Sequence, residues 1–387
     1  GEGVPDAGAP IVRVLPGEVV DDGRILTPSA DRVAAPCRHY KSCGGCAMQH
    51  ASDAFVADWK TDVIRLGLSA RGIETDIRPI LTSPAQSRRR ATLHGRRTKK
   101  GAMVGFFGRG SDALIEVPDC KLLDPALIAA FPVLEKLTTA AASRKSTVGL
   151  VVTLSGNGLD VDILDAKPLA PQGILEMAAL AERHKLARLS WDGEAVATRE
   201  PPVQQFGVAH VTPPPGAFLQ ATAHGQKALL ACVQESVGDA KQVVDLFAGC
   251  GTFTLPAAEK AEVWALEGEA TLIDALDAGW RKATGLKKVK AETRDLFRRP
   301  LLPHELRKTD AVIIDPPRAG AEAQTVELAQ SDVKRIAAVS CNPISFARDA
   351  EILIMGGYRL DWVQPVDQFR WSSHVELAAQ FSKPHMG

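Results

Sequence analysis

Long apolar runs, a secretory signal and a net charge are all missing from this chain of 387 residues. No stretch reaches the ~18 consecutive apolar residues that a transmembrane helix needs, and residues 1–10 lack the basic and apolar regions of a signal peptide. These absences predict a cytoplasmic protein with no membrane partner. The 46 basic and 46 acidic residues cancel to a net charge of +0, so attraction to nucleic acid must come from local patches. With 45% hydrophobic and 24% charged residues, the composition excludes a disordered or collagen-like chain.

Two different apolar patterns divide the chain after a short start. Residues 1–36 are rich in Gly, Pro and Asp and are too few for an independent domain. Short strand-like runs follow as far as the proline loop at residues 212–216, which predicts an α+β domain with a mostly antiparallel sheet. Beyond that loop, apolar runs alternate with helical stretches, which predicts a buried, largely parallel sheet with helices on both faces. We therefore expect three parts, residues 1–36, 37–215 and 216–387.

A glycine-rich loop follows the first strand of the C-terminal part. Residues 248–253 read AGCGTF and open a helix, and Glu267 closes the next strand, where such folds place an acid that accepts hydrogen bonds from ribose. The loop lacks the third glycine of a dinucleotide site and the Lys-Ser/Thr pair of a phosphate-binding loop. S-adenosylmethionine, which has a ribose and no phosphate, fits best; a purely structural turn is the alternative. Asp245, just before the loop, could support it or face that ligand.

Three further polar residues follow or begin strands of the same expected sheet. Asp315 heads the turn DPPRAG after residues 311–314, and Cys341 lies in SCNP after the next strand, so both should emerge at the ligand-binding edge. A thiol there can act as a nucleophile if a helix starting near Ile344 gives it thiolate character. An inert packing cysteine is the alternative, and Asp315 favours the functional interpretation. Glu376 begins the last apolar strand, either as a functional carboxylate or as a solvated strand-end charge.

The seven cysteines are an odd number scattered through a chain without a secretion signal, so disulfides are not expected. Three of them, Cys37, Cys43 and Cys46, lie within ten residues on a loop that contains two glycines. Cys120 is the best fourth ligand, because the remaining cysteines belong to the C-terminal part. Four thiolates suit zinc or an iron–sulfur cluster, and ligand softness does not separate the two. Unligated packing cysteines are the remaining alternative.

A run of basic residues stands out in this neutral chain. Seven cations and no acid occur within residues 88–100. A run of one sign attracts phosphates, which favours an RNA-contacting patch over a plain solvated face. The cations are Arg88, Arg89, Arg90, Arg96, Arg97, Lys99 and Lys100.

With these motifs assembled, the chain resembles the bacterial RNA uracil-C5 (5-methyluridine) methyltransferases, and among them the iron–sulfur branch that acts on 23S ribosomal RNA. The similarity extends from about residue 36 to residue 381. Its six motifs occur in family order: Cys37-x5-Cys43-Gly-Gly-Cys46-x2-Gln49-His50, FLQ at residues 218–220, DLFAGCG at 245–251, DPPR at 315–318, SCNP at 340–343 and HVE at 374–376.

The resemblance implies an α/β fold: a Rossmann-like class I S-adenosylmethionine-dependent methyltransferase domain, preceded by an α+β domain that carries a [4Fe–4S] cluster and binds RNA. It implies Cys341 as the nucleophile and Glu376 as the base. It further implies cofactor contacts from Gln220, Phe247, Glu267, Asp295 and Asp315, and cluster ligands Cys37, Cys43, Cys46 and Cys120.

The chain also departs from the family pattern. Thr252 and Asp295 stand where some relatives carry Asn. Relatives that act on ribosomal RNA usually begin with a small RNA-binding barrel called TRAM, of which residues 1–36 are expected to hold a shortened remnant around residues 15–18.

The implied reaction is chemically reasonable and leaves alternatives. A thiolate that adds to C6 of uracil activates C5 towards a sulfonium methyl group, and a base then removes the C5 proton. The same chemistry on a tRNA uridine is one alternative, and a non-catalytic iron–sulfur protein for RNA binding or redox sensing is another, although intact Cys341 and Glu376 argue against it. DNA cytosine-C5 methylation usually has proline before the cysteine, where this chain has Ser340. RNA is the expected partner, and no obligate protein partner is expected.

Overall fold

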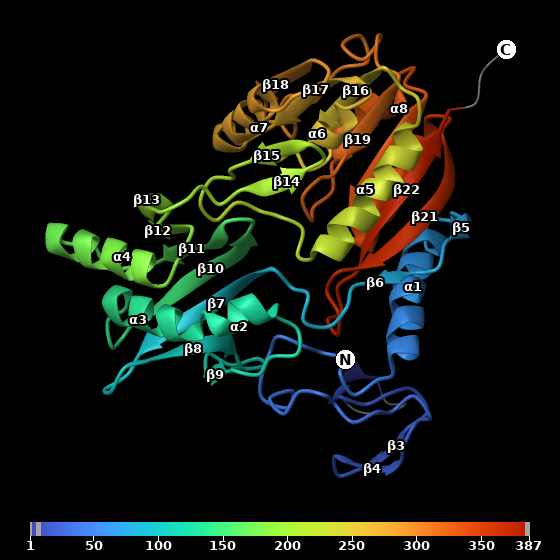
Figure 1. Ribbon diagram of the computed structural model, residues 1–387. Coiled ribbons are helices and arrows are strands. Elements are labelled where there is room, and N and C mark those ends of the chain that lie inside the picture. The colour runs from blue at the N-terminus through green and yellow to red at the C-terminus, as the bar shows by residue number, and fades with distance from the viewer. Residues whose placement is uncertain (1, 5–8, 384–387) are drawn as a thin grey trace.

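Two large sheets dominate the structure, a computed structural model that describes residues 2–4 and 9–383 (Figure 1). The central part contains a seven-stranded sheet and the C-terminal part a nine-stranded sheet. The N-terminal segment forms two small hairpins, β1 (Glu2–Gly3) with β2 (Ile11–Val12) and β3 (Val19–Asp21) with β4 (Arg24–Thr27). No helix in these described ranges is long and apolar enough to cross a membrane.

The central sheet is antiparallel except between β11 and β12, as the strand-and-turn pattern predicts. Its strand order is β13 (Glu194–Thr198), β12 (Arg188–Trp191), β11 (Gly158–Leu164), β10 (Thr147–Ser155), β7 (Arg90–Arg97), β8 (Ala102–Phe107) and β9 (Leu114–Glu116). Helices α2 (Pro125–Ala129), α3 (Phe131–Ala141) and α4 (Pro171–Arg183) accompany it. Alternate strand residues such as Leu93 and Leu150 pack with Leu134 of α3 in a single core.

The C-terminal sheet has five parallel strands followed by β22, which pairs antiparallel with both β20 and β21, and this confirms the largely parallel sheet that the sequence predicts. Its order is β18 (Val289–Thr293), β17 (Glu262–Glu267), β16 (Gln242–Leu246), β19 (Ala311–Ile314), β20 (Arg335–Ser340), β22 (Glu376–Ser382), β21 (Arg359–Asp367) and β5 (Asp76–Ile77), with β6 (Leu81–Thr82) also on β21. β5 and β6 thus join this sheet from before the central one. Two strands of the expected domain 37–215 thus pair with a strand of the expected domain 216–387. The division of the chain into these domains stays a prediction.

Helices cover both faces of the C-terminal sheet, as predicted (Figure 1). On β19, Val312 and Ile314 enter one core, while Ala311 and Ile313 enter the other. The first core includes α1 (Asp53–Ser69), α8 (Glu322–Ala329) and α9 (Pro343–Met355), and the second includes α5 (Ala223–Val237), α6 (Thr254–Ala257) and α7 (Ala270–Lys282). A short hairpin of β14 (Gln204–Phe206) and β15 (Ala209–Val211) packs on α7.

Candidate active site

Parallel register places three predicted residues at one edge of the C-terminal sheet. Leu246 at the end of β16 pairs with Ile314 at the end of β19, and β20 runs parallel to β19 on its other side. Phe247, Asp315 and Cys341 directly follow these three strands. Open α/β sheets bind their ligands at this carboxyl edge, so the three residues lie where the sequence predicts a site.

Glu376 reaches the same edge from an antiparallel strand. β22 begins at Glu376 and pairs with β20 so that Leu377 lies opposite Ser340. The next residues on the two strands are Glu376 and Cys341, which therefore neighbour each other at the end of the sheet. Glu376 is only 3% exposed, and its charge helps to raise the pKa of the Cys341 thiol.

Burial shifts all three ionisable groups at this edge towards their neutral forms. Burial raises the pKa of Cys341, the Glu376 and Asp315 carboxylates raise it further, and Arg318 opposes them. Burial also raises the pKa of Asp315 to about 7. It raises the pKa of Glu376 to about 8; the charge of Asp315 adds to this rise, and a hydrogen bond from Gln368 opposes it. Burial thus brings the pKa values of both carboxyls close to neutral pH.

The helix after Cys341 does not bring the pKa of this thiol below its ordinary value. α9 begins at Pro343, and the Asn342 side chain caps it by accepting a backbone N–H at 3.1 Å. A helix start favours a thiolate, but burial and the two acids outweigh this effect on the pKa of Cys341. Glu376 and Asp315 are the two carboxylates whose charges raise the pKa of Cys341, and the role of this thiol as a nucleophile stays a prediction.

The glycine loop is held in a tight form by the acid at the end of β17. Gly249 and Gly251 have φ values of 55° and 98°, and a Cβ at Gly251 would come within 3.0 Å of Leu255 and Leu276. The Glu267 carboxylate accepts the N–H of Gly249 at 3.0 Å. It also accepts the N–H groups of Gly268 and Glu269, the two residues after it in the chain. This fixes a carboxylate beside the loop, and its contact with a ribose stays a prediction.

Phe247 and Asp295 flank the same loop. The Phe247 ring lies 5.4 Å from the ring of Phe297 between centroids. Asp295 follows β18 and accepts the N–H groups of Phe297 and Arg298 at 3.0 and 3.2 Å. Phe247, Glu267 and Asp295 thus lie together at the ends of three neighbouring strands.

Asp245 supports the loop from inside the sheet. It is completely buried, and its Oδ2 accepts a hydrogen bond from Oγ1 of Thr254, the first residue of α6, at 2.5 Å. Its Oδ1 has no partner within the described ranges. Burial raises the pKa of this carboxyl to about 7. A buried acceptor without a partner next to the glycine loop fits a site that a cofactor completes.

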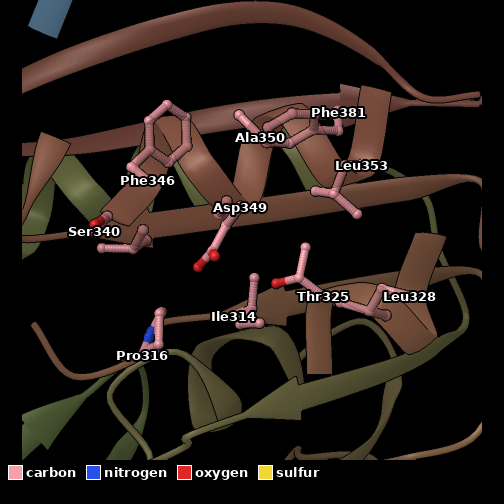
Figure 2. Close-up of a pocket in the computed structure, with 12 residues that line it drawn as sticks. Ile314, Pro316, Thr325, Leu328, Ser340, Phe346, Asp349, Ala350, Leu353 and Phe381 are labelled. Atoms are coloured by element: carbon pink, nitrogen blue, oxygen red, sulfur yellow. The ribbon is translucent and has the colours of Figure 1, made fainter. Parts of the chain in front are cut away.

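A mostly apolar cavity lies behind the loops that carry Asp315 and Cys341. It is enclosed by β19 and β20 on one side and by α8 and α9 on the other. Figure 2 shows the Asp349 carboxyl of α9 pointing between Pro316 and Ser340. Asp349 also accepts the N–H of Ala321 at 2.9 Å. α9 is thereby tied to the turn that contains Asp315.

Comparisons with known proteins agree with this geometry. A family model described as tRNA (Uracil-5-)-methyltransferase matches residues 183–383. The chain belongs to this family. An "Uncharacterized RNA methyltransferase" of Caulobacter vibrioides is 45% identical over 95% of this chain and 93% of that protein. The "23S rRNA (uracil(1939)-C(5))-methyltransferase RlmD" of Halomonas elongata is 32% identical over 93% of this chain and 79% of that protein.

A solved structure shows the same fold. The tRNA (uracil-54, C5)-methyltransferase of Pyrococcus abyssi, in complex with S-adenosyl-L-homocysteine, superposes with a TM-score of 0.72 over 92% of this chain and 87% of that chain, at 20% identity. The predicted class I S-adenosylmethionine-dependent fold and the predicted RNA methyltransferase activity are confirmed. The iron–sulfur branch, the target RNA and the roles of individual residues stay predictions.

The basic segment of this methyltransferase, which the sequence predicts to contact RNA, also makes contacts within the protein. Arg89 donates to the carbonyl of Gln220 at 3.2 Å, and Arg90 donates to the carbonyls of Gly216 and Ala217 at 3.1 and 3.2 Å. These arginines therefore join the first strand of the central sheet to the linker that precedes α5. Gln220, which is 4% exposed, is held in place by this junction.

Only part of the run is open to solvent. Lys99 and Lys100 are exposed at the turn between β7 and β8. Arg88, Arg89 and Arg90 are partly buried, and none of them forms an ion pair within residues 9–383. The guanidinium groups of these three arginines thus carry positive charge that no ion pair in the described part of the chain neutralises.

The segment of residues 367–376 is anchored by a lysine that the sequence analysis missed. Lys60 of α1 is completely buried, pairs with Asp367 at 2.7 Å and donates to the carbonyl of Phe369 at 3.1 Å. A signal for it exists in the sequence, because Lys60 occupies the buried stripe of α1 four residues before Ile64. A charged residue in such a stripe indicates a buried partner.

The loop that carries the clustered cysteines also contacts the segment of residues 367–376. The N–H groups of Ala47 and Met48 donate to the carbonyl of Trp371 at 2.7 and 2.9 Å. The Arg88 guanidinium lies over the Phe369 ring at 5.8 Å. The cysteine loop therefore supports the turn that leads to the predicted base.

The four clustered cysteines lie near one another. Cys37, Cys43 and Cys120 are buried and Cys46 is partly buried. Burial raises the pKa values of Cys43 and Cys120 and raises that of Cys46 to about 12, and charges on the other thiols of the set add to each rise. Within residues 2–4 and 9–383, no three His, Cys, Asp or Glu side chains are arranged to hold a metal ion. The structure thus brings the thiols together without a preformed metal-ion site.

Proposed function

We propose that this methyltransferase transfers the methyl group of S-adenosylmethionine to C5 of a uridine in 23S ribosomal RNA. The position of Cys341 beside Glu376, one residue beyond the last paired residues of β20 and β22, carries the proposal, because the reaction needs a nucleophile and a base at one pyrimidine ring. The name of the Halomonas relative supports ribosomal RNA as the target. A tRNA uridine is the alternative, in keeping with the name of the family model.

Cys341 starts the reaction in this proposal. Its thiolate adds to C6 of uracil, and the electron pair of the C5–C6 bond moves towards O4, which makes C5 nucleophilic. C5 then takes the methyl group as the carbon–sulfur bond of the sulfonium breaks, leaving S-adenosylhomocysteine. Glu376 removes the C5 proton, the C5–C6 double bond re-forms and the Cys341 sulfur departs. The uridine must first be turned out of its stack.

We assign the cofactor to the loops at the ends of β16, β17 and β18. The Glu267 carboxylate, fixed on the N–H of Gly249, suits ribose hydroxyls. Asp315 and Gln220 lie on the side of the site nearer to Cys341 and Glu376. The proposed contacts are Gln220, Phe247, Glu267, Asp295 and Asp315.

We further propose that Cys37, Cys43, Cys46 and Cys120 hold a [4Fe–4S] cluster. Four soft thiolates from two separate loops suit such a cluster, and their mutual electrostatic influence supports one shared site. Bound there, a cluster would cross-link the cysteine loop to Cys120 and stiffen the support of residues 367–376.

Anaerobically purified protein is expected to be brown, with broad charge-transfer absorption and about four irons per chain. Cys37→Ser should lose the iron and lower the melting temperature, because it removes a ligand. Cys232→Ser, which changes a buried cysteine of α5 outside the set, should keep the iron. Metal analysis of the anaerobic preparation checks this, and stoichiometric zinc without iron would contradict the assignment.

Neutralising Arg88, Arg89 and Arg90 together is expected to weaken RNA binding and to flatten its salt dependence. The melting temperature should also fall, because Arg89 and Arg90 bond to the linker carbonyls. Replacing the exposed Lys99 and Lys100 by alanine separates the two effects: it should reduce the salt slope by roughly 1 to 2 without loss of stability. Unchanged salt slopes in both variants would show that the segment does not contact RNA.

Mass-spectrometric mapping of 5-methyluridine in RNA from cells that lack the gene tests the proposed function. Loss of one 5-methyluridine from 23S ribosomal RNA is expected, with its return when the wild-type gene is restored. Loss from tRNA alone would move the target to tRNA. Unchanged 5-methyluridine in every RNA would contradict the proposal.

A further inference from the structure

A buried glutamine links the predicted base to the predicted cofactor residue Gln220. Gln368 follows β21 and is 1% exposed. Its Nε2 donates one hydrogen bond to Oε2 of Glu376 and another to Oε1 of Gln220. Its Oε1 accepts the N–H of Thr222 at 3.3 Å. Every polar atom of this side-chain amide therefore has a partner, either in the segment just before α5 or at the start of β22.

These three partners fix which way the amide points. The backbone N–H of Thr222 can only donate, so it selects the oxygen of Gln368 as its neighbour. The nitrogen of Gln368 must then face the two side-chain oxygens, and both of its hydrogens are used. An ionised carboxylate can only accept hydrogen bonds, so the Glu376 form that best matches this donor is the charged one.

We propose that Gln368 is a positioning residue that holds Glu376 in the orientation in which it removes the C5 proton and that favours the ionised form of this carboxyl. The inference rests on the proposed function for the proton transfer itself. Gln368 acts through Glu376 and needs no contact with the RNA or the cofactor. By engaging Gln220 at the same time, it ties the base to the start of α5 across the catalytic edge.

The surroundings of Glu376 explain why such a donor is needed. Asp315 after β19 and Asp367 at the end of β21 both disfavour its charge, and burial disfavours it most. Lys60 of α1 pairs with Asp367 and not with Glu376. Cys341 faces Glu376 from β20. Gln368 thus provides the hydrogen bond that opposes burial and two neighbouring carboxylates.

Other charged groups near the segment act on different residues. Arg318 lowers the pKa of the Cys341 thiol. The His374 ring lies two residues before Glu376; burial lowers its pKa, and so do the positive charges of Arg318, Lys60 and Arg88. Because Cys341 and His374 also titrate near this site, an infrared carboxyl signal is assigned to Glu376 only if it is absent from Glu376→Gln.

Gln368→Met tests the proposal, because methionine has a similar length and cannot donate. The pKa of Glu376, followed as a carboxyl band in infrared titration with Glu376→Gln as the reference, should rise by about one unit. In single-turnover assays the covalent protein–RNA complex should decay about tenfold more slowly at neutral pH, since less of the base is ionised. Raising the pH should restore the decay, whereas methyl transfer should change little.

Two further variants separate this effect from a loss of packing. Gln368→Glu keeps the shape, removes the amide donors and places a second carboxyl beside Glu376, so the higher carboxyl pKa of this pair should lie above that of Glu376 in the wild type even if the methionine variant is unstable. Gln364→Met changes another buried glutamine of β21, whose amide donates to the carbonyls of Pro79 and Pro365. It should leave both the pKa of Glu376 and the decay of the complex unchanged.

An unchanged infrared pKa in Gln368→Met and Gln368→Glu would overturn the proposal. So would slow decay of the complex that no increase in pH relieves, because that result indicates lost geometry without a change in ionisation. A wild-type protein that forms no complex and no methylated uridine would contradict the proposed function instead, and the infrared titration would still decide the role of Gln368.

Discussion

Replacing Cys341 with alanine is expected to lower methylation by roughly 10⁴-fold or more and to leave no covalent protein–RNA complex. Without the thiol nothing adds to C6, so C5 remains too weak a nucleophile to take the methyl group. Binding of S-adenosylmethionine should persist, because Phe247, Glu267 and Asp295 lie on other loops. Nucleoside mass spectrometry and denaturing electrophoresis measure the two losses.

Cys232→Ala is the matched control for this prediction. Cys232 is a buried cysteine that packs in the core formed with α5, away from the carboxyl edge of the sheet. Its loss should leave both turnover and the covalent complex in place. Near-normal turnover in Cys341→Ala would show that the covalent mechanism is wrong.

Replacing Glu376 with glutamine is expected to stop the reaction at a later step. The thiol can still attack and C5 can still take the methyl group, but no base removes the C5 proton, so Cys341 cannot leave. Turnover should fall by about 10²- to 10⁴-fold, and a covalent complex should accumulate with S-adenosylmethionine and survive denaturing electrophoresis. This opposite behaviour of the two variants distinguishes a nucleophile from a base.

Glu235→Gln serves as its control, because Glu235 pairs with Arg78 at the protein surface. It should turn over normally and form no lasting complex. Normal turnover of Glu376→Gln without a trapped complex would assign proton removal to another group, and Asp315 would then be the first candidate.

Much of the fold can be predicted from the sequence because its signals are local. Apolar runs separated by helical stretches specify a parallel sheet, and each run ends at a polar motif that marks the carboxyl edge. The pairing of β5 and β6 with β21 cannot be predicted in this way. These strands have two residues each and pair with a strand almost 300 positions away, so no local sequence pattern predicts them.

The site shows the same division between local and distant information. Asp315, Cys341 and Glu376 are predicted because each lies at a strand end. Gln368 has no comparable signal, since its role depends on contacts with Gln220 and Thr222 that form only when the chain folds.

The basic run shows what a charge pattern leaves out. Its composition favours an RNA-contacting patch, which stays a prediction, but it does not indicate that Arg89 and Arg90 also bond to carbonyls of a linker more than 120 residues away. Lys60 is the opposite case, because its place in an apolar stripe signals burial before the partner is known.

Peptide mapping of the covalent complex between the wild-type protein and an RNA carrying 5-fluorouridine tests the central claim most directly. Fluorine cannot leave as a cation where Glu376 would take a proton, so the reaction should halt after methyl transfer. We expect a methylated, fluorinated nucleotide attached to the peptide that contains Cys341. Attachment to another cysteine, such as Cys250 in the glycine loop, or no complex with an RNA that the protein methylates when it carries ordinary uridine, would contradict it.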